Sequence, residues 1–185
     1  MTARALRRAR VWCAAMLCGA VALPVAAQGP SEYEVKGAFL LNFVKFVEWP
    51  AEAFESPQSP IVLCVAGRDP FDGRLHALVR GEQVGGRPLQ VRLLPQPPSA
   101  PAGCHLLFVP AGQNYAERFF RASAGSPVLT VGDDSRALHH GCVIAFELDA
   151  RRVRFAINPR AATDAGLRLS ARLLQVARIV GQERR

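Results

Sequence analysis

IVLCVA (residues 61–66) is a short apolar run rich in β-branched side chains, which is typical of a strand buried on both faces of a sheet. Sheets of that kind have helices packed on each side. The run therefore predicts an α/β protein. Further strand patterns follow it at residues 88–94, 105–109, 128–131, 142–148 and 152–157.

Helical patterns alternate with these strands. Residues 33–47 place apolar side chains three and four positions apart, the spacing of a helix with a wide apolar face, and Pro50 ends that segment. Shorter helices are predicted over residues 72–80 and 113–122. The alternation predicts a three-layer α/β sandwich with a mixed, mostly parallel sheet of about six strands, flanked by helices. The last two strand patterns are expected to form an antiparallel hairpin near the C-terminus.

Residues 161–180 have the spacing of one more amphipathic helix. We expect its apolar row to cover the sheet and its arginines to face solvent. The apolar row consists of Leu169, Leu173, Val176 and Val180, and the arginines that lie mainly off it are Arg168, Arg172 and Arg178.

The first 27 residues have the pattern of a secretory signal. Four arginines and no acidic residue precede a charge-free run over residues 11–24, and Val25-Ala26-Ala27 ends the segment with small side chains. The charge-free run has 14 residues, whereas a membrane-spanning helix needs about 20. We therefore expect export to the periplasm, cleavage after Ala27, and a single domain over residues 28–185.

Part of the high net charge belongs to this segment. The chain has 23 basic and 15 acidic residues and a formal net charge of +8, but residues 28–185 keep 19 basic and 15 acidic residues and a charge of +4. A charge of that size is ordinary for a soluble domain. Because the sequence has no cluster of Lys and Arg with interleaved aromatic residues, we expect no nucleic-acid partner.

No arrangement in the sequence points to catalysis. Cys104 and His105 are neighbours, but successive side chains of a strand point to opposite faces, so the pair is not a nucleophile–base set. His139 and His140 follow an acidic pair, yet adjacent histidines do not readily bind one ion, and no H-x₃-H or C-x₂-C spacing occurs. Glycine-rich phosphate loops are also absent. We expect a protein that is not an enzyme and that has no metal or cofactor.

Three cysteines remain in residues 28–185, and an exported protein matures where disulfides form. Cys64 lies inside the first strand pattern and Cys104 opens the third, so neighbouring parallel strands would let their sulfur atoms approach. The same two residues are compatible with buried thiols that act as small hydrophobes. Cys142 begins another strand and is expected to be a buried free thiol.

A particular order of segments carries a family resemblance. The segments are YEVKGAFLLNFVKFVEWP (residues 33–50), IVLCVAGRDPF (61–71), GRP (86–88), CHLLF (104–108), LTV (129–131) and VRFAIN (153–158). In this order they resemble the YfiR/HmsC-type periplasmic family, and the resemblance covers nearly all of residues 28–185. KFVEWP and RFAIN are specific when they occur together.

The resemblance implies a periplasmic regulator that represses a membrane-bound diguanylate cyclase, or a related inner-membrane sensor, by binding its periplasmic sensor region. Cyclic-di-GMP and biofilm formation would then stay low. The resemblance also implies an outer-membrane lipoprotein that sequesters the regulator, a homodimer, and a disulfide that maintains the inhibitory fold. Cys64 and Cys104 fall where the family has that disulfide, whereas Cys142 has no partner for a second one.

The candidate surface for the partner consists of Trp49 and Phe54, together with the basic face of the last helix. Apolar residues of this kind also occur in ordinary cores, and the sequence does not separate the two interpretations.

A different class of function stays open. Open α/β sheets commonly bind small molecules at the carboxyl ends of their parallel strands. The loops after Val65, Val109 and Val131 would line such a crevice in this chain. The alternative is therefore a periplasmic module that senses a nucleotide or another anion.

Overall fold

The computed structural model describes residues 29–97, 103–112 and 114–181, and most of its strands join one sheet. The strands of this sheet are β2 (Ile61–Ala66), β3 (Gln83–Val84), β4 (Arg87–Leu94), β5 (Leu106–Val109), β6 (Leu129–Gly132), β7 (Ile144–Asp149), β8 (Arg152–Ile157) and β10 (Arg178–Ile179). They lie in the order β10-β8-β7-β6-β5-β2-β4-β3. Within the described residues, five neighbouring pairs are parallel, whereas β7 with β8 and β3 with β4 are antiparallel.

The predicted fold class is confirmed. The sheet is mixed and mainly parallel, helices flank it, and β7 and β8 form the expected hairpin near the C-terminus. This sheet has two strands more than the six that the sequence predicts, namely β3 and β10, which are two-residue strands at its edges. Segments that short have no apolar periodicity by which a sequence pattern could reveal them.

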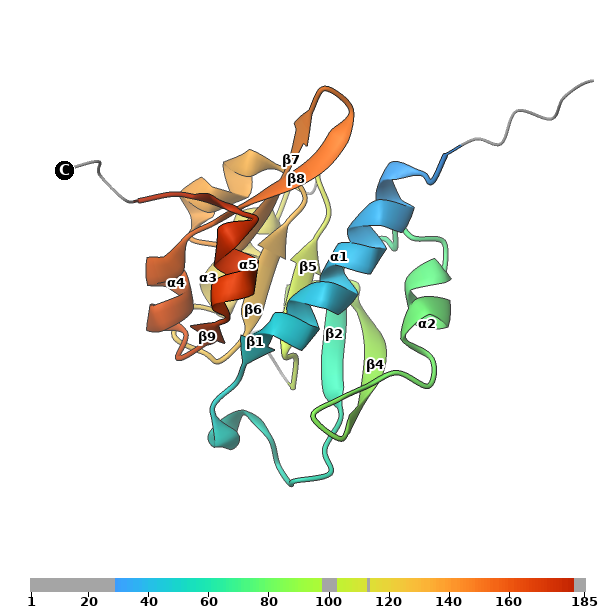
Figure 1. Cartoon of the computed structure of the whole chain (residues 1–185), viewed down its shortest axis with the longest axis vertical. Helices are drawn as coiled ribbons and strands as arrows, with labels where there is room; N and C mark the ends of the chain where they lie inside the picture. The colour runs from blue at the N-terminus through green and yellow to red at the C-terminus, as the bar shows by residue number, and fades with distance from the viewer. Residues whose placement is uncertain (1–28, 98–102, 113, 182–185) are drawn as a thin grey trace, which may run out of the picture.

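Helices cover both faces of the sheet (Figure 1). On one face α1 (Glu32–Phe46), α2 (Arg74–Val79) and α5 (Ala171–Gln175) contribute to the larger hydrophobic cluster. On the other face α3 (Ala116–Ala122) and the 3-10 helix η2 (Ser135–His140) contribute to a smaller cluster. η2 packs closely on β6 because Gly132 has no side chain, and a Cβ atom there would lie 2.0 Å from the Cβ of Ala137.

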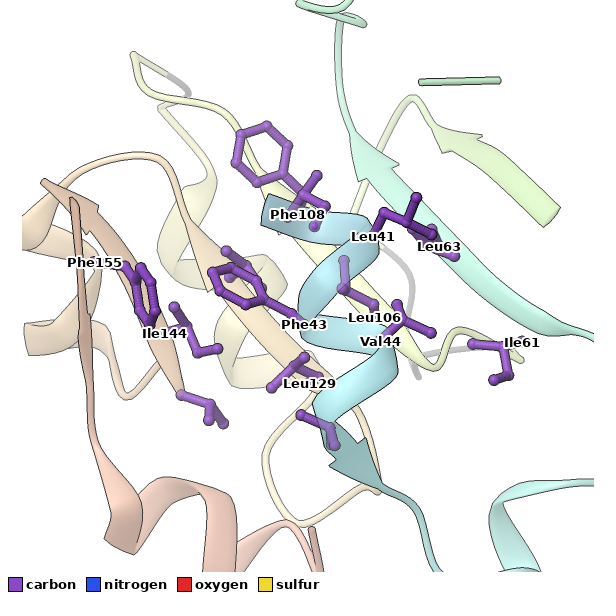
Figure 2. Packing of buried hydrophobic residues seen from close by; sticks show 14 of the residues in the cluster. Leu41, Phe43, Val44, Ile61, Leu63, Leu106, Phe108, Leu129, Ile144 and Phe155 are labelled. Atoms are coloured by element: carbon purple, nitrogen blue, oxygen red, sulfur yellow. The ribbon is translucent and has the colours of Figure 1, made fainter. Parts of the chain in front are cut away.

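α1 forms where its sequence predicts a helix. The Ser31 hydroxyl accepts a hydrogen bond from the backbone of Glu34, whose carboxylate accepts one from the Ser31 N–H, so the helix begins with a capping box. Its apolar side then packs into the centre of the sheet, as Figure 2 shows for Phe43 and Val44. The sheet residues around it in that view include Leu63, Leu106, Phe108, Leu129 and Ile144.

The prediction of one continuous helix over residues 161–180 is wrong. The structure has α4 (Pro159–Asp164), then β9 (Arg168–Leu169), α5 and β10. β9 pairs antiparallel with β1 (Val47–Glu48), the short strand that follows α1. The expected basic helix face does not exist, because Arg168 lies in β9, Arg172 in α5 and Arg178 in β10. Arg168 pairs with Glu48, and Arg178 pairs with Glu147.

Local chemistry explains the break. Gly166 has a left-handed φ of +68°, which stops a helix, and the hydroxyl of Ser170 then caps a new one by accepting from the Leu173 N–H. Of the predicted apolar row, Leu173 is buried, but Val176 is 72% exposed. The apolar residues therefore recur three and four positions apart here although they do not belong to one helix.

In the described part of the chain no helix has the length and apolar character needed to cross a membrane. The predicted signal segment and its cleavage site after Ala27 lie outside the described residues.

Candidate functional site

A disulfide joins Cys64, inside β2, to Cys104, which lies two residues before the neighbouring parallel strand β5. Their Cα atoms lie 5.8 Å apart, within the usual range of about 4.4–6.8 Å for a disulfide. Both side chains are buried. The guanidinium group of Arg92, on the next strand β4, donates to both sulfur atoms, at 3.7 Å from Cys64 and 3.5 Å from Cys104.

His105 connects this disulfide to the segment that follows β1. Its Nδ1 accepts from the backbone N–H of Val62 at 3.1 Å, and its Nε2 lies 3.1 Å from the carbonyl oxygen of Ala53. These two partners fix a neutral ring that carries its proton on Nε2. The backbone carbonyl of His105 also accepts from the indole N–H of Trp49 at 3.0 Å. His105, the residue after Cys104, therefore contacts the segment from Trp49 to Phe54 at two places, the Trp49 indole and the Ala53 carbonyl.

Phe54 contacts the same histidine. Its ring stacks on the ring of His105 with 4.5 Å between the centroids, and the guanidinium carbon of Arg87 lies 3.7 Å from the Phe54 centroid. Arg87 in turn donates to the carbonyl oxygens of Ser56 and Ser59, at 2.8 Å each. We call the segment from Trp49 to Phe54 the aromatic loop. Its 3-10 turn η1 (Ala51–Ala53) lies between the two aromatic residues.

The two predicted contact residues and the predicted disulfide thus lie together around His105. Trp49 and Phe54 are both half-buried, so each ring combines contacts inside the protein with a surface open to solvent. The connecting role of His105 was not predicted from the sequence. Its adjacency to Cys104 was the one available signal, because Ala53 and Val62 are far from it in the chain.

The environment of His105 predicts a dependence of stability on pH. Burial lowers the pKa of His105 below its usual 6.5, the carbonyl of Ala53 opposes this, and the charges of Arg87 and Arg92 lower it further. The unfolded chain therefore binds this proton more readily than the folded chain. This contribution to stability is full above pH 6.5 and is lost as the pH falls below that value.

We expect the urea midpoint to be lower at about pH 5.5 than at about pH 7.5. The decrease should be smaller in His105→Asn, which has no titrating ring at this position. The fluorescence of Trp49 in the native state should change over the same pH range. His76→Asn, at an exposed histidine, is the matched control and should keep the wild-type pH dependence. An unchanged pH dependence in His105→Asn would show that another group is responsible.

Cys142 is a free, fully buried thiol, as the sequence predicts. Its Sγ donates to the carbonyl oxygen of Ile144 at 3.2 Å. Burial, together with the nearby charge of Asp134, raises the pKa of this thiol to about 12 against the effect of backbone hydrogen bonds. A thiol with that pKa and no exposed surface is an unreactive part of the core.

A second buried polar cluster lies at the other, carboxyl end of the parallel strands. Asp133 follows β6, and its Oδ2 accepts from the Tyr33 hydroxyl at 2.7 Å and from the Ala111 N–H at 2.9 Å. Its Oδ1 pairs with the ammonium group of Lys36, which is 2% exposed and also pairs with Glu32. Burial and the hydrogen bond to Asp133 raise the pKa of Tyr33. The cluster fastens the first turns of α1 to the end of the sheet.

The crevice that the alternative hypothesis requires lies beside this cluster. It has a volume of about 260 Å³ and is lined by residues after β5 and β6, but the loop after Val65 does not contribute. Asp133 is satisfied by the contacts above, and Asp134 pairs with Arg136 at 2.6 Å. The charged groups of the crevice are thus paired within the chain. Among the described residues, no group of His, Cys, Asp and Glu side chains is arranged to hold a metal ion.

Comparison with known proteins adds one finding. A family model described as YfiR/HmsC-like matches residues 33–178, which extend from α1 to the first residue of β10 and include the disulfide and the aromatic loop. No curated protein matches the chain.

Proposed function

Because the chain belongs to the YfiR/HmsC-like family, we propose that it restrains a membrane-bound diguanylate cyclase by binding the periplasmic sensor region of that enzyme. The family consists of periplasmic regulators and not of enzymes, and the partner that it implies is a diguanylate cyclase sensor. Residues 1–27 serve as the export signal in this proposal, with cleavage after Ala27. Residues 28–185 form the regulatory domain, which acts as a homodimer and is sequestered by an outer-membrane lipoprotein.

The arrangement around His105 carries the proposal. A surface that recognises a partner needs apolar groups that are exposed and held in place, because ordering a mobile loop on binding lowers the affinity. Trp49 and Phe54 meet both conditions, since each is half-buried and each is held by His105. Their rings are the part of the domain that contacts the sensor.

The position of the disulfide gives this surface a dependence on thiol redox state. Cys104 directly precedes His105, and its sulfur is bonded to Cys64 on the neighbouring strand. When the bond is intact, the start of β5 is fixed and His105 holds the aromatic loop. When the bond is reduced, that restraint is lost one residue away from the ring that supports Phe54. The oxidised form is therefore the one that binds the sensor, and the difference in affinity between the two forms sets the output.

Cyclic-di-GMP levels in the native host test the role of the aromatic loop. Deleting the gene should raise cyclic-di-GMP, and the wild-type chain should lower it again. Phe54→Glu should fail to lower it, because a charge would replace the apolar contact surface. Val176→Glu changes an exposed apolar residue elsewhere and should act like the wild type. Full activity of Phe54→Glu, at equal protein abundance, would exclude the aromatic loop as the contact surface.

A further inference from the structure

A groove lies between the first turns of α1 and the tip of the β7–β8 hairpin, which projects from the body of the protein in Figure 1. Its volume is about 620 Å³. Leu148 and Val153 are paired across the hairpin, so they lie on the same face, and Leu148 is 58% exposed. The lining residues are Pro30, Glu32, Val35, Phe39, Leu148, Arg151, Arg152 and Val153.

The outer edge of β8 is open beside this groove. β10 pairs with β8 only at Ala156 and Ile157, and the other described strands do not reach that edge. The carbonyl of Ile157 faces β10, where it accepts from the Val180 N–H at 2.9 Å. Because main-chain groups alternate in direction along a strand, the N–H and C=O of Val153 face the same outer edge. A strand added at this edge could form hydrogen bonds with these main-chain groups.

The charge around the groove selects the kind of strand that fits. Arg151 and Arg152 are exposed, and no acidic side chain in the described part of the chain pairs with either. Arg154 is also exposed but pairs with Asp149. Ala150 and Arg151 have left-handed φ values of 45° and 67°, a turn that L-residues seldom adopt, and it places two unpaired guanidinium groups at the rim.

The same charges argue against a second copy of this chain as the occupant. Antiparallel pairing of two β8 edges around Val153 would place Arg152 of one copy opposite Arg154 of the other. Like charges in that position destabilise a strand pair. A basic segment is disfavoured for the same reason, whereas an acidic segment gains two ion pairs.

We propose that this groove binds an extended acidic segment of a partner protein, added as a strand to the open edge of β8. Alternate apolar side chains of the segment pack on Val153, on the face that it shares with Leu148, and its carboxylates pair with Arg151 and Arg152. Strand addition of this kind combines main-chain hydrogen bonds with side-chain pockets. The site goes beyond the proposed function, because it is separate from the aromatic loop and does not require the partner to be a cyclase.

Photocrosslinking in the native host tests the proposal. Leu148 is replaced by the photoreactive residue p-benzoylphenylalanine in the full chain, and the crosslinked peptide is sequenced by mass spectrometry. We expect a peptide of net negative charge with alternating apolar residues. Arg151→Glu together with Arg152→Glu should lower the yield about tenfold, because the interfacial charges become repulsive. Arg118→Glu together with Arg172→Glu, at two other exposed arginines, should leave the yield unchanged.

Several outcomes would overturn the proposal. One is a crosslink to lipid, to a second copy of this chain or to a neutral or basic segment. Another is a crosslinking yield that does not fall when the charges of Arg151 and Arg152 are reversed. The last is a yield no higher than that obtained with the same photoreactive residue at position 176. The photoreactive residue at Phe54 probes the aromatic loop in parallel. Failure at position 148 with capture of a sensor at position 54 would reject the groove alone, and the reverse result would reject the proposed function alone.

Discussion

Replacing Cys64 and Cys104 together by serine is expected to lower the free energy of unfolding by about 4 kcal/mol. The bond connects residues 40 positions apart, and the chain-entropy relation for a loop of that length gives a value of about 4 kcal/mol. The serine hydroxyls would also be buried where the sulfur atoms now lie, which adds to the loss. Urea denaturation of residues 28–185, followed by circular dichroism, measures the change.

Cys142→Ala is the matched control for this double substitution, because it alters a buried cysteine outside the bond. Its midpoint should fall with added reductant as much as the wild-type midpoint does, whereas the double serine variant should not respond. A wild-type midpoint that reductant does not move, under conditions where free-thiol titration shows the bond to be open, would contradict a stabilising role for the disulfide.

Lys36→Met is expected to lower the free energy of unfolding by about 3–5 kcal/mol, which is typical when one partner of a buried ion pair is removed. The substitution leaves the Asp133 carboxylate buried without its cationic partner. Asp133→Asn in addition removes that uncompensated charge, so the double variant should lose less than the sum of the two single losses. A double-mutant cycle in urea measures the coupling.

Lys45→Met is the control on the same helix. Its ammonium group lies 3.2 Å from Glu82, but both side chains are exposed, and exposed ion pairs contribute about 0–1 kcal/mol. If Lys36→Met cost no more than Lys45→Met, the cluster at Asp133 would not be what fastens α1 to the sheet.

The sheet was predictable because burial on both faces leaves a strong mark on the sequence. IVLCVA and the later strand patterns follow from the need for apolar side chains on each side of a parallel strand. The C-terminal segment was not predictable from spacing, because Gly166 and Ser170 divide it while Leu169 and Leu173 keep a helical interval. Capping chemistry at single residues outweighed the periodicity there.

The site was predictable only in parts. Cys64, Cys104, Trp49 and Phe54 were each recognisable from the sequence, but their meeting point depends on contacts between distant segments. His105 bonds to Ala53 and Val62, which precede it by 52 and 43 positions. No periodic pattern encodes pairs at such distances, so the connection between disulfide and aromatic loop becomes visible only in the folded chain.

Affinity recovery from the native cell envelope tests the central claim most directly. Tagged, oxidised protein of residues 28–185 is incubated with detergent-solubilised inner membranes, and the bound proteins are identified by mass spectrometry. We expect the oxidised wild type to retain a membrane diguanylate cyclase or a related sensor, and the variant with Cys64→Ser and Cys104→Ser to lose it. Equal recovery by both would contradict the redox dependence, and recovery of no such sensor by either would contradict the proposed function itself.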